Sequence, residues 1–104
     1  MKAMDLFCGA GGVSVGLHRA GFVVVGVDNR PQKRYPFTFV QAEALEYVAA
    51  HGHEFDAIHA SPPCQKYTSL KGMWNHKGEH PDLIDETRAL LRASERPFCI
   101  ENVP

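Results

Sequence analysis

The sequence lacks the features that mark membrane, secreted and disulfide-stapled proteins. No apolar run in the 104 residues approaches the roughly 20 residues that a membrane-spanning helix needs. The start, Met-Lys-Ala-Met-Asp, leads into a strand pattern rather than a signal peptide. Only three cysteines occur, Cys8, Cys64 and Cys99, and they form no C-x-x-C pair, which disfavours a disulfide framework and a zinc ribbon. These absences predict a soluble, cytoplasmic protein without membrane contact.

The chain also has little net charge. Its formal charge is -1, so it lacks the basic excess of a domain that grips nucleic acid by itself. The six histidines are spread from His18 to His80, and we expect no metal site among them. If the chain acts on a nucleic acid, most of the binding contacts must lie elsewhere.

What the sequence does contain is a regular alternation of strand and helix patterns. Apolar or β-branched runs predict strands at 3–7, 22–27, 38–40, 55–60 and 97–103. Helical spacing of apolar residues predicts helices at 13–20, 43–50 and 82–95. This order predicts one α/β domain over residues 1–104, with an open, doubly wound parallel sheet that binds ligands at the carboxyl ends of its strands.

A loop of small residues follows the first predicted strand. Positions 5–12 read Asp-Leu-Phe-Cys-Gly-Ala-Gly-Gly, which lets the backbone approach a ligand in front of a helix N-terminus. The dinucleotide pattern G-x-G-x-x-G is not met, because Ser14 stands at its third glycine. Asp28 ends the second predicted strand and can accept hydrogen bonds from ribose hydroxyls. Together these features predict a nucleotide-like pocket.

Three motifs together resemble those of the cytosine-5 DNA methyltransferases. They are the loop at 5–12, Pro-Pro-Cys-Gln at 62–65 and Glu-Asn-Val at 101–103, in matching order and rough spacing. The resemblance covers residues 1–104 and implies a Rossmann-like fold of the S-adenosylmethionine-dependent methyltransferase type, truncated after the fifth strand. It also implies methyl transfer from S-adenosylmethionine to C5 of cytosine in double-stranded DNA, in a bacterial or phage-like restriction-modification setting.

The resemblance assigns a cofactor site to the first motif and the neighbouring strand ends. Asp28 is expected on the ribose. Glu43 is expected to accept from the adenine amino group, although the family more often has aspartate there and a glutamate can simply start a helix. The other cofactor-binding residues implied are Phe7, Gly9, Ala10, Gly11, Gly12 and Pro62. The substrate-binding residues implied are Pro63, Gln65 and Asn102.

Cys64 is the expected nucleophile. Cytosine C5 attacks a methyl sulfonium poorly, and adding a thiolate across C6 turns the ring into an enamine that can attack from C5. The position of Cys64 after two prolines at a strand end exposes its thiol in a pocket. Cys99, within the fifth predicted strand, and Cys8 are instead expected to be small buried hydrophobes.

Glu101 is the expected second catalytic residue. A carboxylic acid that reaches cytosine N3 and the exocyclic amine stabilises the negative charge that develops on the ring, and the resemblance assigns this role to Glu-Asn-Val. Because strands four and five are expected side by side, Cys64 and Glu101 can face one pocket. The base must be flipped out of the duplex to enter it, and we expect the polar segment 66–80 to close over the DNA. Its candidate DNA contacts are Lys66, Lys71, Lys77 and Trp74.

The resemblance leaves alternatives open, because the family's Arg-x-Arg motif, target-recognition region and terminal helix are not among these residues. We therefore expect activity to need further regions, and the strand at 97–103 to self-associate or pair with a C-terminal half. The alternatives are a non-catalytic fragment that binds S-adenosylmethionine or a partner, and an RNA cytosine-5 methyltransferase. A zinc-dependent deaminase is disfavoured, since its H-x-E is absent and Tyr67 replaces the second cysteine of P-C-x-x-C.

Overall fold

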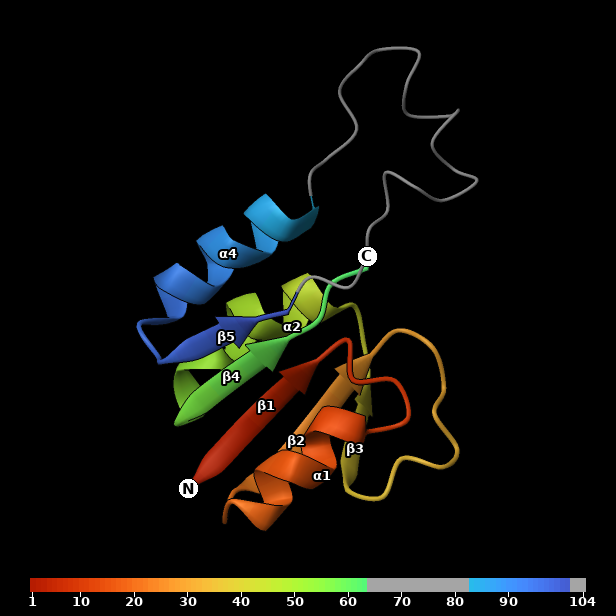
Figure 1. The fold of residues 1–104 in the computed structure, drawn as a ribbon. Coiled ribbons are helices and arrows are strands. Elements are labelled where there is room, and N and C mark those ends of the chain that lie inside the picture. Colours follow the sequence, from red (N-terminus) through yellow and green to blue (C-terminus); the bar gives the residue numbers. More distant parts are fainter. Residues whose placement is uncertain (64–82, 102–104) are drawn as a thin grey trace, which may run out of the picture.

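The computed structural model describes residues 1–63 and 83–101, which form a five-stranded parallel sheet with helices on both faces (Figure 1). The strand order is β3-β2-β1-β4-β5. The bounds of the strands in chain order are β1 Lys2–Leu6, β2 Val23–Asp28, β3 Thr38–Gln41, β4 Ala57–Ala60 and β5 Phe98–Ile100. The order reverses between β1 and β4, which places a ligand-binding crevice at the carboxyl ends of these two strands. The predicted fold class is confirmed.

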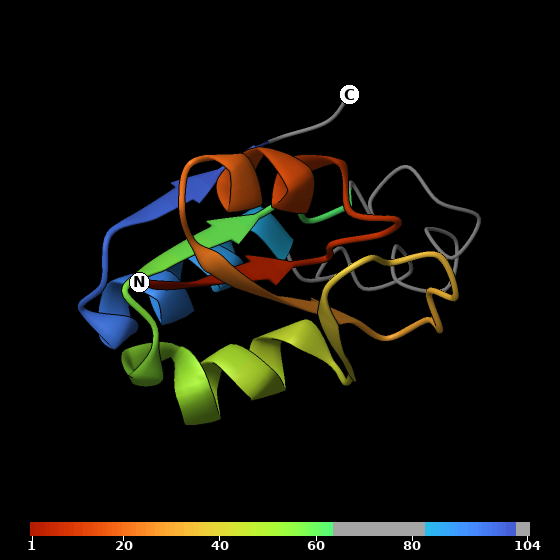
Figure 2. The ribbon, with the colours of Figure 1, turned by 90° about the horizontal axis from the view of Figure 1, so that it is seen from below.

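The helices divide between the two faces of the sheet, as Figure 2 shows. Helix α1 (Gly12–Arg19) covers one face, whereas α2 (Ala44–His51) and α4 (Leu83–Ser94) cover the other. A short 3-10 helix, η1 (Gly52–Glu54), follows α2. Helices α1, α2 and α4 each begin and end within two residues of their predicted bounds, whereas η1 has no counterpart among the predicted helices. None of the described helices is long and apolar enough to cross a membrane.

The main core lies between the sheet and the α2 and α4 face. Strands β1, β2 and β4 send alternate residues to this face, and α4 closes it with Thr87 and Leu91, whose side chains are fully buried. The predicted apolar face of α4 is the reason that this helix docks here. The buried members of the core cluster are Met4, Leu6, Val27, Ala44, Val48, Phe55, Ile58, Ala60 and Leu91.

The prediction that Cys99 is a buried hydrophobe is wrong. Its side chain is exposed, whereas Cys8 is buried as expected. In the described sheet β5 is an edge strand, with β4 on one side only, and no described helix covers its α1 side. A β-strand residue is buried only where another layer packs on its face, so the apolar pattern of β5 does not by itself bury Cys99. The predicted loop segment 66–80 lies wholly outside the described residues. Of the strand predicted at 97–103, residues 102 and 103 lie outside them.

Candidate functional site

A cleft of about 460 Å³ opens at the carboxyl ends of β1, β2 and β4. It lies where the strand order reverses, the edge at which open α/β sheets bind ligands. Its walls combine an aromatic ring, exposed backbone, two carboxylates and a guanidinium. The lining residues are Phe7, Gly9, Asp28, Asn29, Arg30, Gln32, Glu43, Ser61, Pro63 and Leu83.

The loop after β1 is a tight turn with an unusual backbone at its first residue. Phe7 has φ 58, in the left-handed region that non-glycine residues rarely adopt. Backbone hydrogen bonds hold the turn, from Cys8 N to Val27 O at 3.2 Å and from Gly11 N to Cys8 O at 3.1 Å. A Cβ at Gly9 would meet no atom within 4 Å, so the backbone there faces open space. The loop thus presents its backbone to the cleft.

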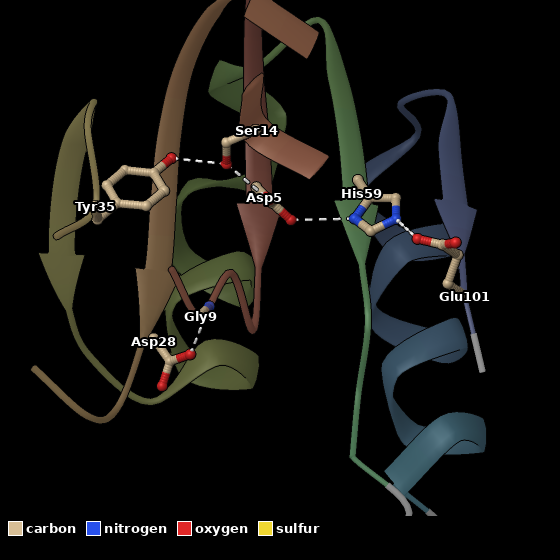
Figure 3. A network of polar contacts seen from close by, with 7 residues as sticks. All are labelled: Asp5, Gly9, Ser14, Asp28, Tyr35, His59 and Glu101. Carbon is tan, nitrogen blue, oxygen red and sulfur yellow. Dashed lines mark hydrogen bonds and ion pairs between the residues drawn. The ribbon is translucent and has the colours of Figure 1, made fainter. Parts of the chain in front are cut away.

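Asp28 ties this loop to the end of β2 (Figure 3). Its Oδ2 accepts from Gly9 N and its Oδ1 accepts from Arg30 N, each at 3.0 Å. A carboxylate oxygen has two lone pairs, so each oxygen can accept one more hydrogen bond from a ligand. The backbone therefore orients the Asp28 carboxylate at the cleft wall and leaves it acceptor capacity toward the cleft.

Glu43 lines the cleft and also caps α2. Its Oε2 accepts from Leu45 N at 3.1 Å and its Oε1 accepts from Glu46 N at 3.0 Å. These are backbone donors that a helix leaves without partners in its first turn. Glu43 therefore caps the start of α2, which is one of the two roles that the sequence suggests for it. Because Glu43 also lines the cleft, a contact with the adenine amino group stays a prediction.

The remaining predicted ligand residues divide into those near the cleft and those away from it. Pro63 lines the cleft, but Ala10, Gly11, Gly12 and Pro62 are not part of its wall. Gly11 has φ 102 and packs against Tyr35, where a Cβ would lie 2.9 Å from the ring. Its conformation therefore serves the turn and its packing. The other predicted residues, Cys64, Gln65 and Asn102, lie outside the described residues.

Glu101 lies directly beside the end of β4. Its backbone N donates to Ala60 O at 2.9 Å, which continues the β4–β5 pairing by one residue. The Pro-Pro-Cys motif begins two residues after Ala60, so the segment that leads to Cys64 leaves the sheet next to Glu101. The side chain is half exposed, with 56% relative accessibility, and its Oε1 lies 2.8 Å from His59 Nε2. The predicted adjacency of strands four and five is confirmed.

Behind Glu101, a row of polar side chains crosses the sheet on its α1 side (Figure 3). His59 Nδ1 lies 3.0 Å from Asp5 Oδ1, and Ser14 Oγ donates to Asp5 Oδ2 at 2.6 Å. The row ends at the hydroxyl of Tyr35, 2.9 Å from Ser14 Oγ. Asp5, Ser14 and His59 are all buried. We call these five residues, from Tyr35 to Glu101, the polar row.

The ionisation of the polar row and its surroundings follows from burial and from the two carboxylates. The hydrogen bond to Asp5 raises the pKa of His59, burial opposes this, and the hydrogen bond to Glu101 raises it further. Burial also raises the pKa of Tyr35 to about 12 and that of the Cys8 thiol to about 12. Cys8 is thus a neutral thiol at physiological pH, which does not suit a nucleophile.

The polar row is the feature that sequence reasoning missed. Asp5 and His59 each interrupt an otherwise apolar strand, and they are register partners in β1 and β4. A charged residue within a buried strand is rare unless it is paired, and this signal was present in the sequence. The partner of each residue became known only from the strand order.

Comparison with known proteins places these features in a family. A model described as C-5 cytosine-specific DNA methylase matches residues 1–104. The type II methyltransferases M.HgiGI and M.HgiDI of Herpetosiphon aurantiacus are 37% and 36% identical to the chain, and each alignment covers 99% of it. M.FnuDI of Fusobacterium nucleatum is 27% identical over 99% of the chain.

The lengths of these relatives differ. The chain covers 90% of M.HgiGI, but only 37% of M.HgiDI and 32% of M.FnuDI, so it spans about a third of the latter two. A solved SAM-dependent methyltransferase from Agrobacterium tumefaciens has a similar fold, with a TM-score of 0.53 and 16% sequence identity. The match covers 98% of this chain and 46% of the Agrobacterium chain. This structural likeness supports the fold.

Proposed function

The chain belongs to the C-5 cytosine-specific DNA methylase family, and from this premise we propose that it carries the cofactor site and reacting side chains of a DNA cytosine-5 methyltransferase. A methyl group passes from S-adenosylmethionine to C5 of cytosine in double-stranded DNA, through a covalent bond between Cys64 and C6. The observation that carries the proposal is the juxtaposition of the carboxylate-lined cleft, its rim residue Pro63 and Glu101 at one edge of the sheet.

S-adenosylmethionine is the cofactor that family membership implies, and the cleft residues fit it. When bound, it supplies an electrophilic methyl group on a sulfonium. Phe7 offers an aromatic face to a purine, and the open space beside Gly9 admits a ligand against the backbone. Asp28 and Glu43 offer acceptors to hydroxyl and amino groups and favour a cationic ligand. The cleft volume lies within the usual range for small-molecule sites.

Cys64 and Glu101 divide the chemistry of the base. The Cys64 thiolate adds to C6, and the Glu101 carboxyl stabilises the charge that this addition places on the ring. Support for the pairing comes from the β4–β5 register, which brings Glu101 next to the strand that leads to Cys64. Residues 1–104 form one domain in this proposal, and remote DNA contacts supply most of the energy for base flipping.

Covalent trapping tests the chemistry. Incubation with S-adenosylmethionine and DNA containing 5-fluorocytosine is expected to give a protein–DNA adduct, because fluorine cannot leave C5 as a proton. The adduct accumulates in a single turnover and is seen by denaturing electrophoresis even where turnover by residues 1–104 is slow. Cys64→Ser is expected to abolish it, and Cys8→Ser, which changes a neutral buried thiol, to retain it. An adduct formed by Cys64→Ser overturns the assignment.

Two parallel measurements separate the alternatives. The same trapping with fluorinated RNA instead of DNA identifies an RNA methyltransferase if only RNA is captured. Titration calorimetry with S-adenosylmethionine identifies a non-catalytic cofactor-binding module if the cofactor binds and neither nucleic acid is trapped. A DNA adduct together with cofactor binding is the result expected.

The edge strand β5 supports the expected partner contact. In the described sheet it pairs with β4 alone, and Phe98 and Cys99 on it are exposed. Open strand edges are templates for pairing with another chain. We therefore expect association through β5, with a second copy or with a separate C-terminal half, and sedimentation of the chain with and without Phe98→Lys tests it. If the chain sediments as a monomer at all concentrations and binds no separate C-terminal half, this part of the proposal is refuted.

A further inference from the structure

Glu101 does not stand alone at the proposed reaction centre, because His59 contacts it from within the sheet. We propose that His59 is a positioning residue, which orients the Glu101 carboxyl and supplies through it the proton that cytosine N3 takes up when the thiolate adds to C6. This inference rests on the proposed function and deepens it.

The hydrogen bonds of the polar row determine where protons lie. Ser14 has one hydroxyl hydrogen, which it donates to Asp5 Oδ2, so the Tyr35 hydroxyl donates to Ser14 Oγ. Asp5 accepts this bond while almost completely buried, and its other oxygen then accepts from His59 Nδ1. The His59 ring is therefore held so that Nδ1 carries a hydrogen that it donates to Asp5, while Nε2 points toward Glu101.

One proton must lie between His59 and Glu101. The Nε2–Oε1 distance is 2.8 Å, a hydrogen-bond length that two bare acceptors do not adopt. Either His59 is an imidazolium beside an ionised Glu101, or His59 is neutral beside a protonated Glu101. In both assignments the pair holds the same transferable proton, and it titrates as a unit.

The surroundings of His59 support a stable pair. The charged groups that face it are Asp5 from β1 and Glu101 after β5, with Cys99 as its register partner in β5. From helix α1, the uncharged Ser14 bonds Asp5, and the uncharged Leu17 lines a pocket together with His59. The pKa of His59 is raised, first by the bond to Asp5, so the pair keeps its proton to higher pH than a free imidazole would.

The exposed side of Glu101 faces away from this network. No hydrogen bond in the described part of the chain engages its Oε2, and the side chain is half exposed. The carboxyl therefore has one oxygen held by His59 and one open to a base. A free glutamate has lost its proton at neutral pH, whereas the pair keeps its shared proton to a higher pH than a free imidazole does, because the bond to Asp5 raises the pKa of His59.

The proton transfer is balanced. As the Cys64 sulfur bonds to C6, the C5=C6 electron pair forms a C4=C5 double bond and the C4=N3 pair moves to N3. N3 takes the single proton of the pair from Glu101, and where that proton lies on His59 Nε2 it passes first to Glu101 Oε1. Glu101 is then an ionised carboxylate beside a neutral His59 that keeps its Nδ1 hydrogen toward Asp5. After C5 has taken the methyl group and lost its own proton to solvent, the C4=C5 pair returns to C5=C6 and expels the thiolate, the N3 electrons re-form the C4=N3 bond, and N3 returns its proton to Glu101, so the pair is restored.

Nitrogen NMR of the histidine rings tests the pair without relying on activity. In the native protein labelled with ¹⁵N-histidine, His59 is expected to titrate above the ordinary value of about 6.5, and Glu101→Gln and Asp5→Asn each to lower that midpoint. The matched control is His51→Gln, which removes an exposed histidine 3.0 Å from Glu54 and should leave the His59 signals unchanged. An ordinary His59 midpoint, unaffected by Glu101→Gln, overturns the proposal.

The pH profile of trapping tests the role. His59→Gln keeps a hydrogen-bond donor but no transferable proton, so the alkaline limb is expected to move to lower pH and the rate at pH 8 to fall about a hundredfold. The acidic limb, which does not depend on the pair, should not move. Asp5→Asn, which leaves the imidazole in place, should give a smaller shift of the same limb and serves if His59→Gln does not fold.

The outcomes separate this inference from the function on which it rests. An adduct whose pH profile is unchanged by His59→Gln and Asp5→Asn overturns the role of His59 and leaves the methyltransferase assignment standing. If the wild-type protein gives no adduct but His59 titrates as expected, the proposed function is refuted, and with it the role of His59 in the reaction. The proton-sharing pair of His59 and Glu101 would still stand.

Discussion

Two sets of carboxylates lie in this small domain, and they are held by different kinds of donor. Asp28 and Glu43 in the cleft accept from backbone N–H groups. Asp5 and Glu101 in the polar row are joined by the side chain of His59, with Ser14 behind Asp5. A backbone N–H does not lose its proton, whereas an imidazole does so near neutral pH. This difference in donors suits the cleft to the binding role, and the row to the proton transfer, that we propose.

Filling the space beside Tyr35 should affect the row far more than the cleft. A Cβ at Gly26 would overlap the Tyr35 ring and crowd Cys8 Sγ, so Gly26→Ala is expected to lower the free energy of unfolding by about 3 kcal/mol. Urea denaturation measures it. Gly16→Ala is the control, because open space surrounds Gly16 on α1, and it should stabilise the protein by up to about 1 kcal/mol. Equal effects of the two substitutions would refute the packing argument.

Removing the charge of Asp28 should affect the cleft and leave the row intact. In Asp28→Asn the amide oxygen can still accept from the loop, but the negative charge is lost. The binding free energy of the protein for S-adenosylmethionine should weaken by about 2 kcal/mol, roughly a thirtyfold loss of affinity. Calorimetry measures the affinity. Asp56→Asn is the control, since Asp56 also accepts from a backbone N–H, that of Lys2 at 2.7 Å, but at the other end of the sheet. Unchanged affinity in folded Asp28→Asn moves the ribose contact elsewhere.

Substitution of Glu43 separates its two roles. Glu43→Ala removes the helix cap and should cost about 1 kcal/mol of unfolding free energy, whereas Glu43→Asp retains a capping carboxylate and should cost little. Thermal denaturation compares the two variants. If the adenine contact exists, cofactor affinity should fall in both, since Asp is shorter. Full affinity in Glu43→Ala would leave the cap as its only role.

The smallest change is expected in the pH dependence of the free energy of unfolding. The folded-state pKa of His59 is raised, so the stability that protonated His59 contributes is complete below its unfolded pKa of about 6.5 and is lost as pH rises through the folded value. The free energy of unfolding, measured in urea between pH 6 and 9, should decline more steeply for the wild type than for His59→Gln. His51→Gln should keep the wild-type slope, because its exposed pair with Glu54 contributes little. Parallel curves for wild type and His59→Gln would contradict the linkage.

Local patterns in the sequence predicted most of the architecture. Strand and helix periods, the small-residue loop and the acid at the end of β2 are properties of short segments. They predicted the α/β fold, a pocket at the strand ends and the place of Asp28 before any contact was known. The motifs at 5–12, 62–65 and 101–103 pointed to the family that the comparisons identify. The roles of Cys64, Gln65 and Asn102 remain predictions.

Other properties depended on which strands lie side by side. Cys99 looked buried because β5 is apolar, yet burial depends on a covering layer, and that face of the described edge strand has none. Asp5, His59 and Glu101 are separated by 54 and 42 residues along the chain and meet only because β4 lies between β1 and β5. Periodicity reports the local backbone and its apolar face, whereas hydrogen bonds across a sheet depend on strand order and register. The tertiary structure therefore decided that a histidine stands behind the predicted acid.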